Sequence, residues 1–262
     1  PVNGYDGDDN IGVVGDNDTL NGSPITLPEI ELSLIGNLPP GLTFDPSTGV
    51  VGVPPGTPAG PYSFDYQLCE RANPSNCDTA TVTVNVEAPE LTATDDTFGP
   101  VNGYDGDDNI GVVGNNDTLN GNPISLPEVE LSLIGNLPPG LTFDPSTGIV
   151  GVPPGTPAGP YSFEYQLCER ANPANCDIAT VTLEVMAAVI EAVDDDYREE
   201  FVSGANGGVA GNVLGNDTLN GQSATLTNVS LSFLTATHSG LTLDESTGQI
   251  LVAAGTPAGQ YE

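Results

Sequence analysis

The sequence contains no lysine and no tryptophan, and only three arginines and one histidine stand against 36 acidic residues. Its formal net charge at pH 7 is -33. A chain this acidic repels nucleic-acid phosphates and anionic membrane surfaces, so we expect no nucleic-acid partner and no docking on such membranes. The lack of lysine also excludes crosslinks between lysine and asparagine side chains. Self-repulsion on this scale disfavours compact modules unless cations are present, which favours a cation-rich exterior as the setting of the protein.

Helical segments and long apolar runs are missing as well. The chain has 33 Gly and 24 Pro with many Thr and Val, and no stretch of Ala, Leu or Arg follows helical spacing. This composition predicts an all-β fold. The longest apolar patch, residues 185–193, is interrupted by Glu191 and is too short to span a membrane. We expect no direct membrane insertion by this window, which also shows no secretory signal.

Groups suited to catalysis are scarce. The one histidine, His238, has no serine, cysteine or lysine nucleophile placed beside it in the pattern of a catalytic site. Paired carboxylates are abundant, as in a glycosidase, but they lie on glycine-rich loops rather than between aromatic walls. We therefore predict that the protein is not an enzyme and that His238 is a surface or packing residue.

Internal repetition dominates the sequence. Residues 1–86 and 100–185 align without a gap at an offset of 99 residues and differ at ten positions. A divergent third copy shares G-N-D-T-L-N-G at 215–221 and G-T-P-A-G at 255–259. This period is too long for a solenoid and predicts tandem β-sandwich domains. We expect three: residues 1–90, which lack the first strand; 91–190; and 191–262, which are divergent and lack the last strands.

Strand patterns recur inside each copy. In the first, residues 29–35, 42–44 and 50–53 read as strands, with a hairpin turn D-P-S-T-G at 45–49. Tyr62, Phe64, Tyr66 and Leu68 alternate onto one face of a further strand, and Ala80, Val82, Val84 and Val86 do the same on the next. These last two strands are predicted to carry most of a modest core.

Four cysteines form two pairs at one spacing, and each pair brackets the same loop, E-R-A-N-P-(S/A)-N. The pairs are Cys69 with Cys77 and Cys168 with Cys176. A zinc site would need a second pair nearby, and free thiols are the other alternative. A disulfide closing a hairpin explains the spacing better, and it implies an oxidising compartment. The chain-entropy model gives such a loop about 2.5 kcal/mol of stabilisation.

The segment N-L-P-P-G-L-T-F-D-P-S-T-G-V-V-G-V-P, followed by G-T-P-A-G-P-Y-S-F-D-Y-Q-L-C-E, resembles the Ig-like, cadherin-like repeats of bacterial surface proteins. D-D-D at 194–196 with G-N-V-L-G-N-D-T at 211–218 is similar to the opening of such repeats in long adhesins. The resemblance implies tandem Ig-like (cadherin-like) β-sandwich domains at an extracellular or cell-surface location. It does not imply a particular binding activity.

Acidic residues gather where one copy hands over to the next, in a glycine-rich run without a basic residue. Such hard oxygen donors suit calcium. From their crowding we predict calcium ligands at Asp95, Asp96, Asp105, Asp107, Asp108 and Asp117, with counterparts in the first copy at Asp6, Asp8, Asp9 and Asp18. The resemblance independently implies calcium at the acidic linkers Asp95–Asp96 and Asp194–Asp195, and the third copy repeats Asp117 as Asp217.

The alternative is that these aspartates make turns and stay hydrated. Turns need Asn or Gly as readily as Asp and do not require this charge density, so calcium is favoured. The third copy departs from the pattern, because V-S-G-A-N-G-G stands where the others carry a loop with Y-D-G-D-D-N. Its own loop therefore lacks those carboxylates.

Sugar attachment and sugar binding are two further hypotheses. The N-glycosylation pattern occurs at Asn17, Asn116, Asn216 and Asn228. Because this pattern fixes only two residue types, a simple Asn-Asp turn is the favoured explanation of the three N-D-T sites. A calcium-dependent carbohydrate-binding module is the alternative function, with surface glycans as ligands. It would need an exposed aromatic platform, for which Tyr5 and Tyr104 are the candidates in the acidic loops.

We predict a non-enzymatic structural repeat array, the stalk of an adhesin or an extracellular bacterial filament, pinned by disulfides and stiffened by calcium. Its expected partners are neighbouring copies of the same repeat or chain. The limits of the sequence fit either a window of a longer repetitive polymer, which we favour, or a pilus-like polymer in which a neighbouring subunit donates the missing strands.

Overall fold

The computed structural model describes all 262 residues and contains strands but no helix, which confirms the predicted all-β class. It therefore has no helix long and apolar enough to cross a membrane. The chain forms two compact units, Pro1–Val101 with Asp105–Val185, and Asn102–Tyr104 with Met186–Glu262. The three predicted module boundaries stay a prediction.

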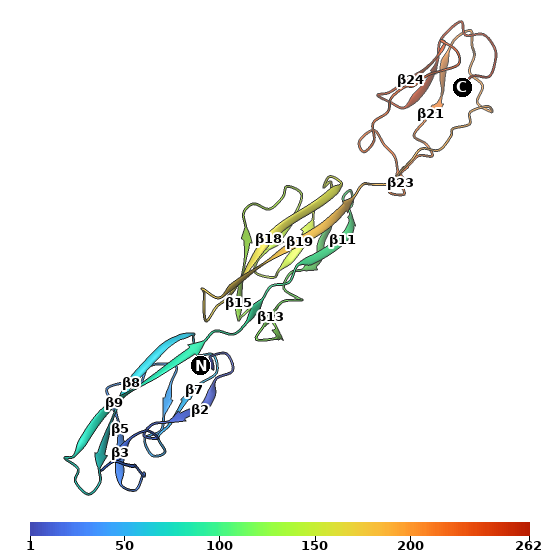
Figure 1. Cartoon of the computed structure of the whole chain (residues 1–262). Coiled ribbons are helices and arrows are strands. Elements are labelled where there is room, and N and C mark those ends of the chain that lie inside the picture. Colours follow the sequence, from blue (N-terminus) through green and yellow to red (C-terminus); the bar gives the residue numbers. More distant parts are fainter. The chain divides into compact units, whose positions relative to one another are not determined.

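The first sandwich, built from the strands before residue 88, has two sheets and a short ribbon. One sheet has the order β1-β9-β8-β5, the other β2-β7-β6, and β3 pairs with β4. The long strands β8 and β9 lie side by side in Figure 1. The bounds are β1 (Val2–Asn3), β2 (Asp8–Val13), β3 (Thr19–Leu20), β4 (Ser23–Pro24), β5 (Ile30–Ile35), β6 (Thr43–Phe44), β7 (Val50–Val53), β8 (Gly60–Glu70) and β9 (Cys77–Glu87).

The second sandwich repeats this arrangement and adds one strand. Its sheets have the orders β11-β19-β18-β15 and β12-β17-β16, and β10 extends the short ribbon to β10-β13-β14. The bounds are β10 (Leu91–Thr92), β11 (Asp96–Asn102), β12 (Asp107–Val112), β13 (Thr118–Leu119), β14 (Asn122–Pro123), β15 (Val129–Ile134), β16 (Thr142–Asp144), β17 (Ile149–Val152), β18 (Gly159–Glu169) and β19 (Cys176–Met186).

The third set of strands forms two small sheets, β20-β22-β23 and β21-β25-β24. Residues 229–234 form no strand there, whereas their counterparts 129–134 form β15, which pairs with β18. The set buries Leu219 and Ala224 but leaves Phe201 and Leu234 exposed. The bounds are β20 (Ile190–Glu191), β21 (Gly208–Asn212), β22 (Thr218–Leu219), β23 (Gln222–Ser223), β24 (Leu241–Asp244) and β25 (Gln249–Val252).

Each of the two sandwiches has its own hydrophobic core, and the cores come from the predicted faces, except that Ala80 is exposed in the first sandwich. In the first, Phe64 and Tyr66 on β8 pack with Val84 and Val86 on β9. Side chains of a β-strand alternate between its two faces, so these four residues lie on the same face of the sheet and are buried together. The strand expected at 29–35 begins one residue later, because the Glu29 amide donates to the Thr26 carbonyl in the preceding turn.

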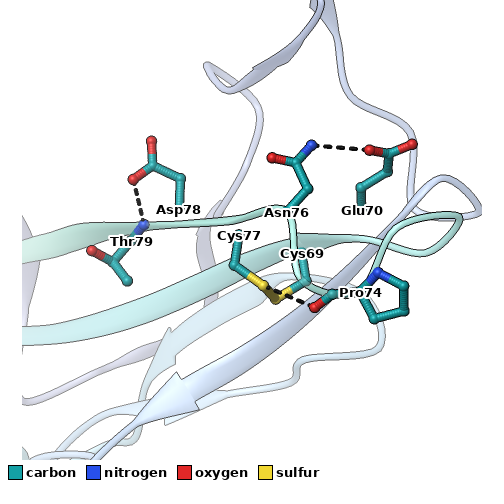
Figure 2. The surroundings of a disulfide bond; sticks show 7 residues. All are labelled: Cys69, Glu70, Pro74, Asn76, Cys77, Asp78 and Thr79. Atoms are coloured by element: carbon teal, nitrogen blue, oxygen red, sulfur yellow. Dashed lines mark hydrogen bonds between the residues drawn. A yellow bond between two sulfur atoms is a disulfide. The ribbon is translucent and has the colours of Figure 1, made fainter.

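Both predicted disulfides are present, Cys69–Cys77 and Cys168–Cys176. Each joins residues that face each other at the end of a hairpin, so the covalent bond closes the loop between two long strands. Figure 2 shows the first of these loops, in which the Asn76 amide donates to the Glu70 carboxylate. The predicted pairing of the four cysteines is confirmed, and none is free.

The D-P-S-T-G turns owe their shape to one carboxylate and one glycine. Asp45 Oδ1 accepts hydrogen bonds from the Ser47 amide at 2.9 Å and the Ser47 hydroxyl at 2.7 Å, and Oδ2 accepts from Thr48 at 2.8 Å. Gly49 has φ of 76°, where a side chain is strained. The same turn recurs around Asp144 and Asp244.

Acid should weaken these turns. Hydrogen bonds from the serine and threonine of each turn hold the pKa of Asp45, Asp144 and Asp244 below 3.8, the value of an unperturbed aspartate. Because the folded-state pKa is the lower one, the stabilisation is complete above 3.8 and is lost as the pH falls through the folded-state pKa. NMR titration of the carboxyl carbons should give midpoints below 3.8 for these three residues. Midpoints at or above 3.8 would show that the turns do not depend on the ionised carboxylates.

Candidate functional site

The second sandwich buries two of the predicted calcium ligands. Asp96 is the first residue of β11 and Asp117 directly precedes β13, and their exposed fractions are 6% and 1%. The G-N-N-D turn places Asp117, since its amide donates to the Gly114 carbonyl at 3.2 Å and its carbonyl accepts from Ile124. Two buried carboxylates in a chain this acidic require hydrogen-bond donors, a proton or a cation.

Asp117 is satisfied by the protein. The Thr94 amide donates to its Oδ1 at 2.7 Å, and the Tyr165 hydroxyl, from β18, donates to its Oδ2 at 2.8 Å. Burial raises the pKa of Asp117, and these two donors partly offset the rise. Tyr165 is itself fully buried, so burial and then the Asp117 carboxylate raise its pKa.

Asp96 is not fully satisfied. Its Oδ2 is buried and has no hydrogen-bond partner. Burial raises the pKa of Asp96 to about 6; the nearby Tyr165 hydroxyl opposes this rise, and the charges of Asp117 and Asp95 add to it. Tyr165 has one hydroxyl proton, which goes to Asp117. An orphaned carboxylate oxygen beside a second carboxylate fits a small hard cation, and equally a proton.

Hydrogen bonds from a backbone amide and an asparagine side chain hold the segment next to the acidic pair in place. Asp95 Oδ1 accepts from the Thr180 amide on β19 at 2.8 Å. The Asn116 side-chain amide donates to the carbonyls of Thr94 and Asp95 at 3.1 and 3.2 Å. Asn116 therefore ties the segment before β11 to the N-N-D turn, a structural role that its reading as a glycosylation site did not reveal.

The other two copies contain parts of the same arrangement. In the first, the Tyr66 hydroxyl donates to Asp18, which is only half-buried beside an open hollow of about 270 Å³. In the third, the Val193 amide donates to Asp217 at 2.8 Å, and the Tyr197 hydroxyl donates to Asp195 at 3.2 Å. Burial raises the pKa of Asp195. Asn216 donates to the carbonyl of Asp194, as Asn116 does to that of Asp95.

The aspartates of the glycine-rich loops lie apart from this pair. Asp8 and Asp107 each accept a hydrogen bond from a backbone amide two residues on, at 2.9 Å, and Asp6 accepts one from Asn120 at 2.8 Å. Asp9, Asp105 and Asp108 are exposed. No three His, Cys, Asp or Glu side chains converge to hold a metal ion. The predicted loop ligands stay a prediction, and the fit to a cation rests on Asp96 with Asp117.

The remaining candidates take part in local contacts. The Asn228 carbonyl oxygen accepts from the Thr225 amide at 2.7 Å, and Asn17 is exposed. Tyr5 donates its hydroxyl to Glu128 at 2.9 Å, while Tyr104 is 38% exposed. The His238 ring packs against the Tyr261 ring in a tilted arrangement, with the ring centroids 5.0 Å apart, and its Nδ1 accepts a hydrogen bond from the Gly240 amide. Glycosylation and sugar binding stay predictions.

No protein family and no curated protein matches the sequence. Solved structures that resemble the chain include human CDH23 EC21-23, at 17% identity and a TM-score of 0.32, with 97% of this chain and 91% of that chain covered. The human desmocollin-1 ectodomain matches at 12% identity and 0.33, with 97% and 52% covered. Drosophila N-cadherin EC1-4 matches at 17% and 0.30, with 60% and 41% covered. The chain therefore spans less than two thirds of the length of the Drosophila N-cadherin EC1-4 structure.

Its sheets and cores define the chain as an array of β-sandwich domains. This all-β sandwich architecture agrees with the Ig-like, cadherin-like fold class that the sequence resemblance implies.

Removing the Tyr165 hydroxyl tests the buried pair. Tyr165→Phe should destabilise the second sandwich by about 1–3 kcal/mol, because it leaves a buried carboxylate oxygen without its donor. The matched control is Tyr66→Phe in the first sandwich, which should cost less because Asp18 reaches water. Hydrogen exchange resolved to each core measures the two effects. Equal losses in both sandwiches would contradict the importance of burial.

Proposed function

We propose that the chain is a non-enzymatic structural array, the stalk of an extracellular adhesin or filament on a bacterial surface. The observation that carries this proposal is that two successive sandwiches repeat the same strand pairing around separate cores. Strands β5, β8 and β9 have the same register as β15, β18 and β19, and each trio belongs to a separate hydrophobic core. Nearly identical domains in succession supply length and stiffness, whereas a catalytic or binding function needs only one distinctive site.

The disulfides support an exterior location. They close the hairpin ends of two small domains that lack tryptophan and rely on modest cores. Disulfides of this kind persist in oxidising compartments. The charge of -33 supports the same setting, because divalent cations outside the cell relieve the repulsion between carboxylates.

Calcium is the finer part of the proposal. Asp96 and Asp117 are the residues that would hold the ion in the second sandwich, with Asp195 and Asp217 at the related position in the third copy. Bound calcium would neutralise the buried negative charge there. The support is Asp96 Oδ2, a buried atom without a hydrogen-bond partner, in a residue that is 6% exposed and lies beside a second buried carboxylate.

Calcium added to the chelator-treated full chain should raise the Tm, and this rise should shrink at least several-fold in Asp96→Asn. The substitution removes charge from the buried pair and leaves the exposed loops intact. Asp107→Asn is the matched control, because Asp107 lies in the exposed loop that the sequence analysis also selected. Calorimetry and isothermal titration of each variant with calcium chloride measure the effect.

An unchanged Tm for the wild type would overturn the calcium assignment while leaving the structural array standing. Loss of the calcium effect in Asp107→Asn, but not in Asp96→Asn, would move the ion to the loops. Specific retention on a glycan array would favour the carbohydrate-binding alternative over the stalk.

A further inference from the structure

The contact between the first and second sandwiches, which belong to one compact unit, is made by uncharged amides as much as by carboxylates. Asn120 makes three of its hydrogen bonds. Its Oδ1 accepts from the side-chain amide of Asn3 at 2.9 Å, and its Nδ2 donates to the Asp6 carboxylate at 2.8 Å. Its backbone amide donates to the Glu90 carbonyl at 2.7 Å. Its φ of 53° places it in the left-handed region that asparagine tolerates better than most residues.

A second contact uses the phenol of Tyr5. It donates to Glu128 Oε1 at 2.9 Å across the joint, and Ser125 donates to the other oxygen of the same carboxylate. The Ser125 hydroxyl and then the Tyr5 hydroxyl hold the pKa of Glu128 below its usual value. Asp6 and Glu128 are therefore stabilised by donors from the protein at this joint.

The disulfide loop of the second sandwich supplies the third contact. The side-chain oxygen of Asn172 accepts a hydrogen bond from the Ala59 backbone amide. The side-chain amide of Asn175 donates to the Pro89 carbonyl at 2.9 Å. Glu169 holds both asparagines in place, at 2.7 and 2.8 Å, and the Cys168–Cys176 bond closes the loop that carries them.

The first sandwich provides an internal comparison. Its own loop differs from that of the second sandwich only by Ser75 in place of Ala174, and Glu70 accepts hydrogen bonds from Asn73 and Asn76 at 2.7 and 2.9 Å. The hydrogen bonds of those asparagines stay within their own loop. Glu70 stays partly exposed, whereas the identical Glu169 is buried, with 4% exposure. Because both loops hold their asparagines through the same glutamate, we attribute the difference in burial to the neighbouring sandwich.

We propose that Asn120, Glu128 and the disulfide loop at 169–176 form a docking surface, which we call the interlock. Its partner is the pole of a preceding copy of the same repeat, recognised through the Asn3, Tyr5 and Asp6 side chains and the backbone at Ala59 and Pro89. The interlock fixes the orientation of the two sandwiches without a metal ion. The second disulfide thus rigidifies a joint, while the first closes a loop outside it.

NMR residual dipolar couplings of the full chain, recorded in chelator, test the interlock. In the wild type, couplings from both sandwiches should fit one common alignment tensor. Asn120→Gly should abolish the common fit, because glycine keeps the left-handed backbone but removes the side-chain bonds to Asn3 and Asp6. Asn21→Gly is the matched control: Asn21 has φ of 52° at the equivalent position of the first sandwich, and the common fit should persist.

A disulfide pair provides the second comparison. Cys168→Ser with Cys176→Ser should loosen the joint, whereas Cys69→Ser with Cys77→Ser should not, and the amide spectrum shows whether each variant remains folded. If a disulfide variant unfolds, Asn172→Ala against Asn73→Ala makes the same comparison. The interlock is overturned if the wild type in chelator needs two tensors, or if Asn120→Gly behaves as the wild type does. Ordering of the joint only after calcium addition would overturn it in favour of a metal-dependent joint.

Discussion

Carboxylate repulsion is the constraint on which the rest of this structure depends. With 36 acidic residues and three arginines, the chain cannot neutralise its charge through ion pairs, and its one salt bridge joins Arg198 to Asp196 two residues away. Hydrogen-bond donors take the place of counter-charges. Backbone amides, threonine and serine hydroxyls, asparagine amides and tyrosine phenols reach the carboxylates of the turns, the acidic pair and the joint. Such donors stabilise the ionised form without adding charge.

The acidic pair marks where this supply of donors runs out. Asp117 receives two donors, whereas one oxygen of Asp96 receives none although both residues are buried. A carboxylate in that position must keep a proton or meet a cation. The site is therefore compatible with calcium even though the exposed aspartates, which carry most of the local charge, do not converge around it. Burial, rather than the density of charge along the sequence, distinguishes the candidate ligands.

The proposed interlock and the proposed calcium site would be two separate sources of rigidity along the array. The interlock is built from amides, a phenol and a disulfide-closed loop, and it needs no ion. Calcium at the buried pair would stabilise the second sandwich from within. The two sources act on different parts of the chain, so one can fail while the other holds, and a stalk with both keeps its shape over a wider range of ionic conditions.

The sequence by itself determined the repeat, the all-β class, the faces of β8 and β9, the D-P-S-T-G turns and the cysteine pairing. These features depend on spacing, alternation and turn chemistry among residues that are close in the sequence. Only the tertiary structure decided which member of each identical pair is buried. Asp117 and Glu169 are buried whereas Asp18 and Glu70 are not, because β10, the start of β11 and the neighbouring sandwich cover the second copy. Identical residues acquire different roles from neighbours that are distant in sequence, and the spacing within a repeat contains no information about those neighbours.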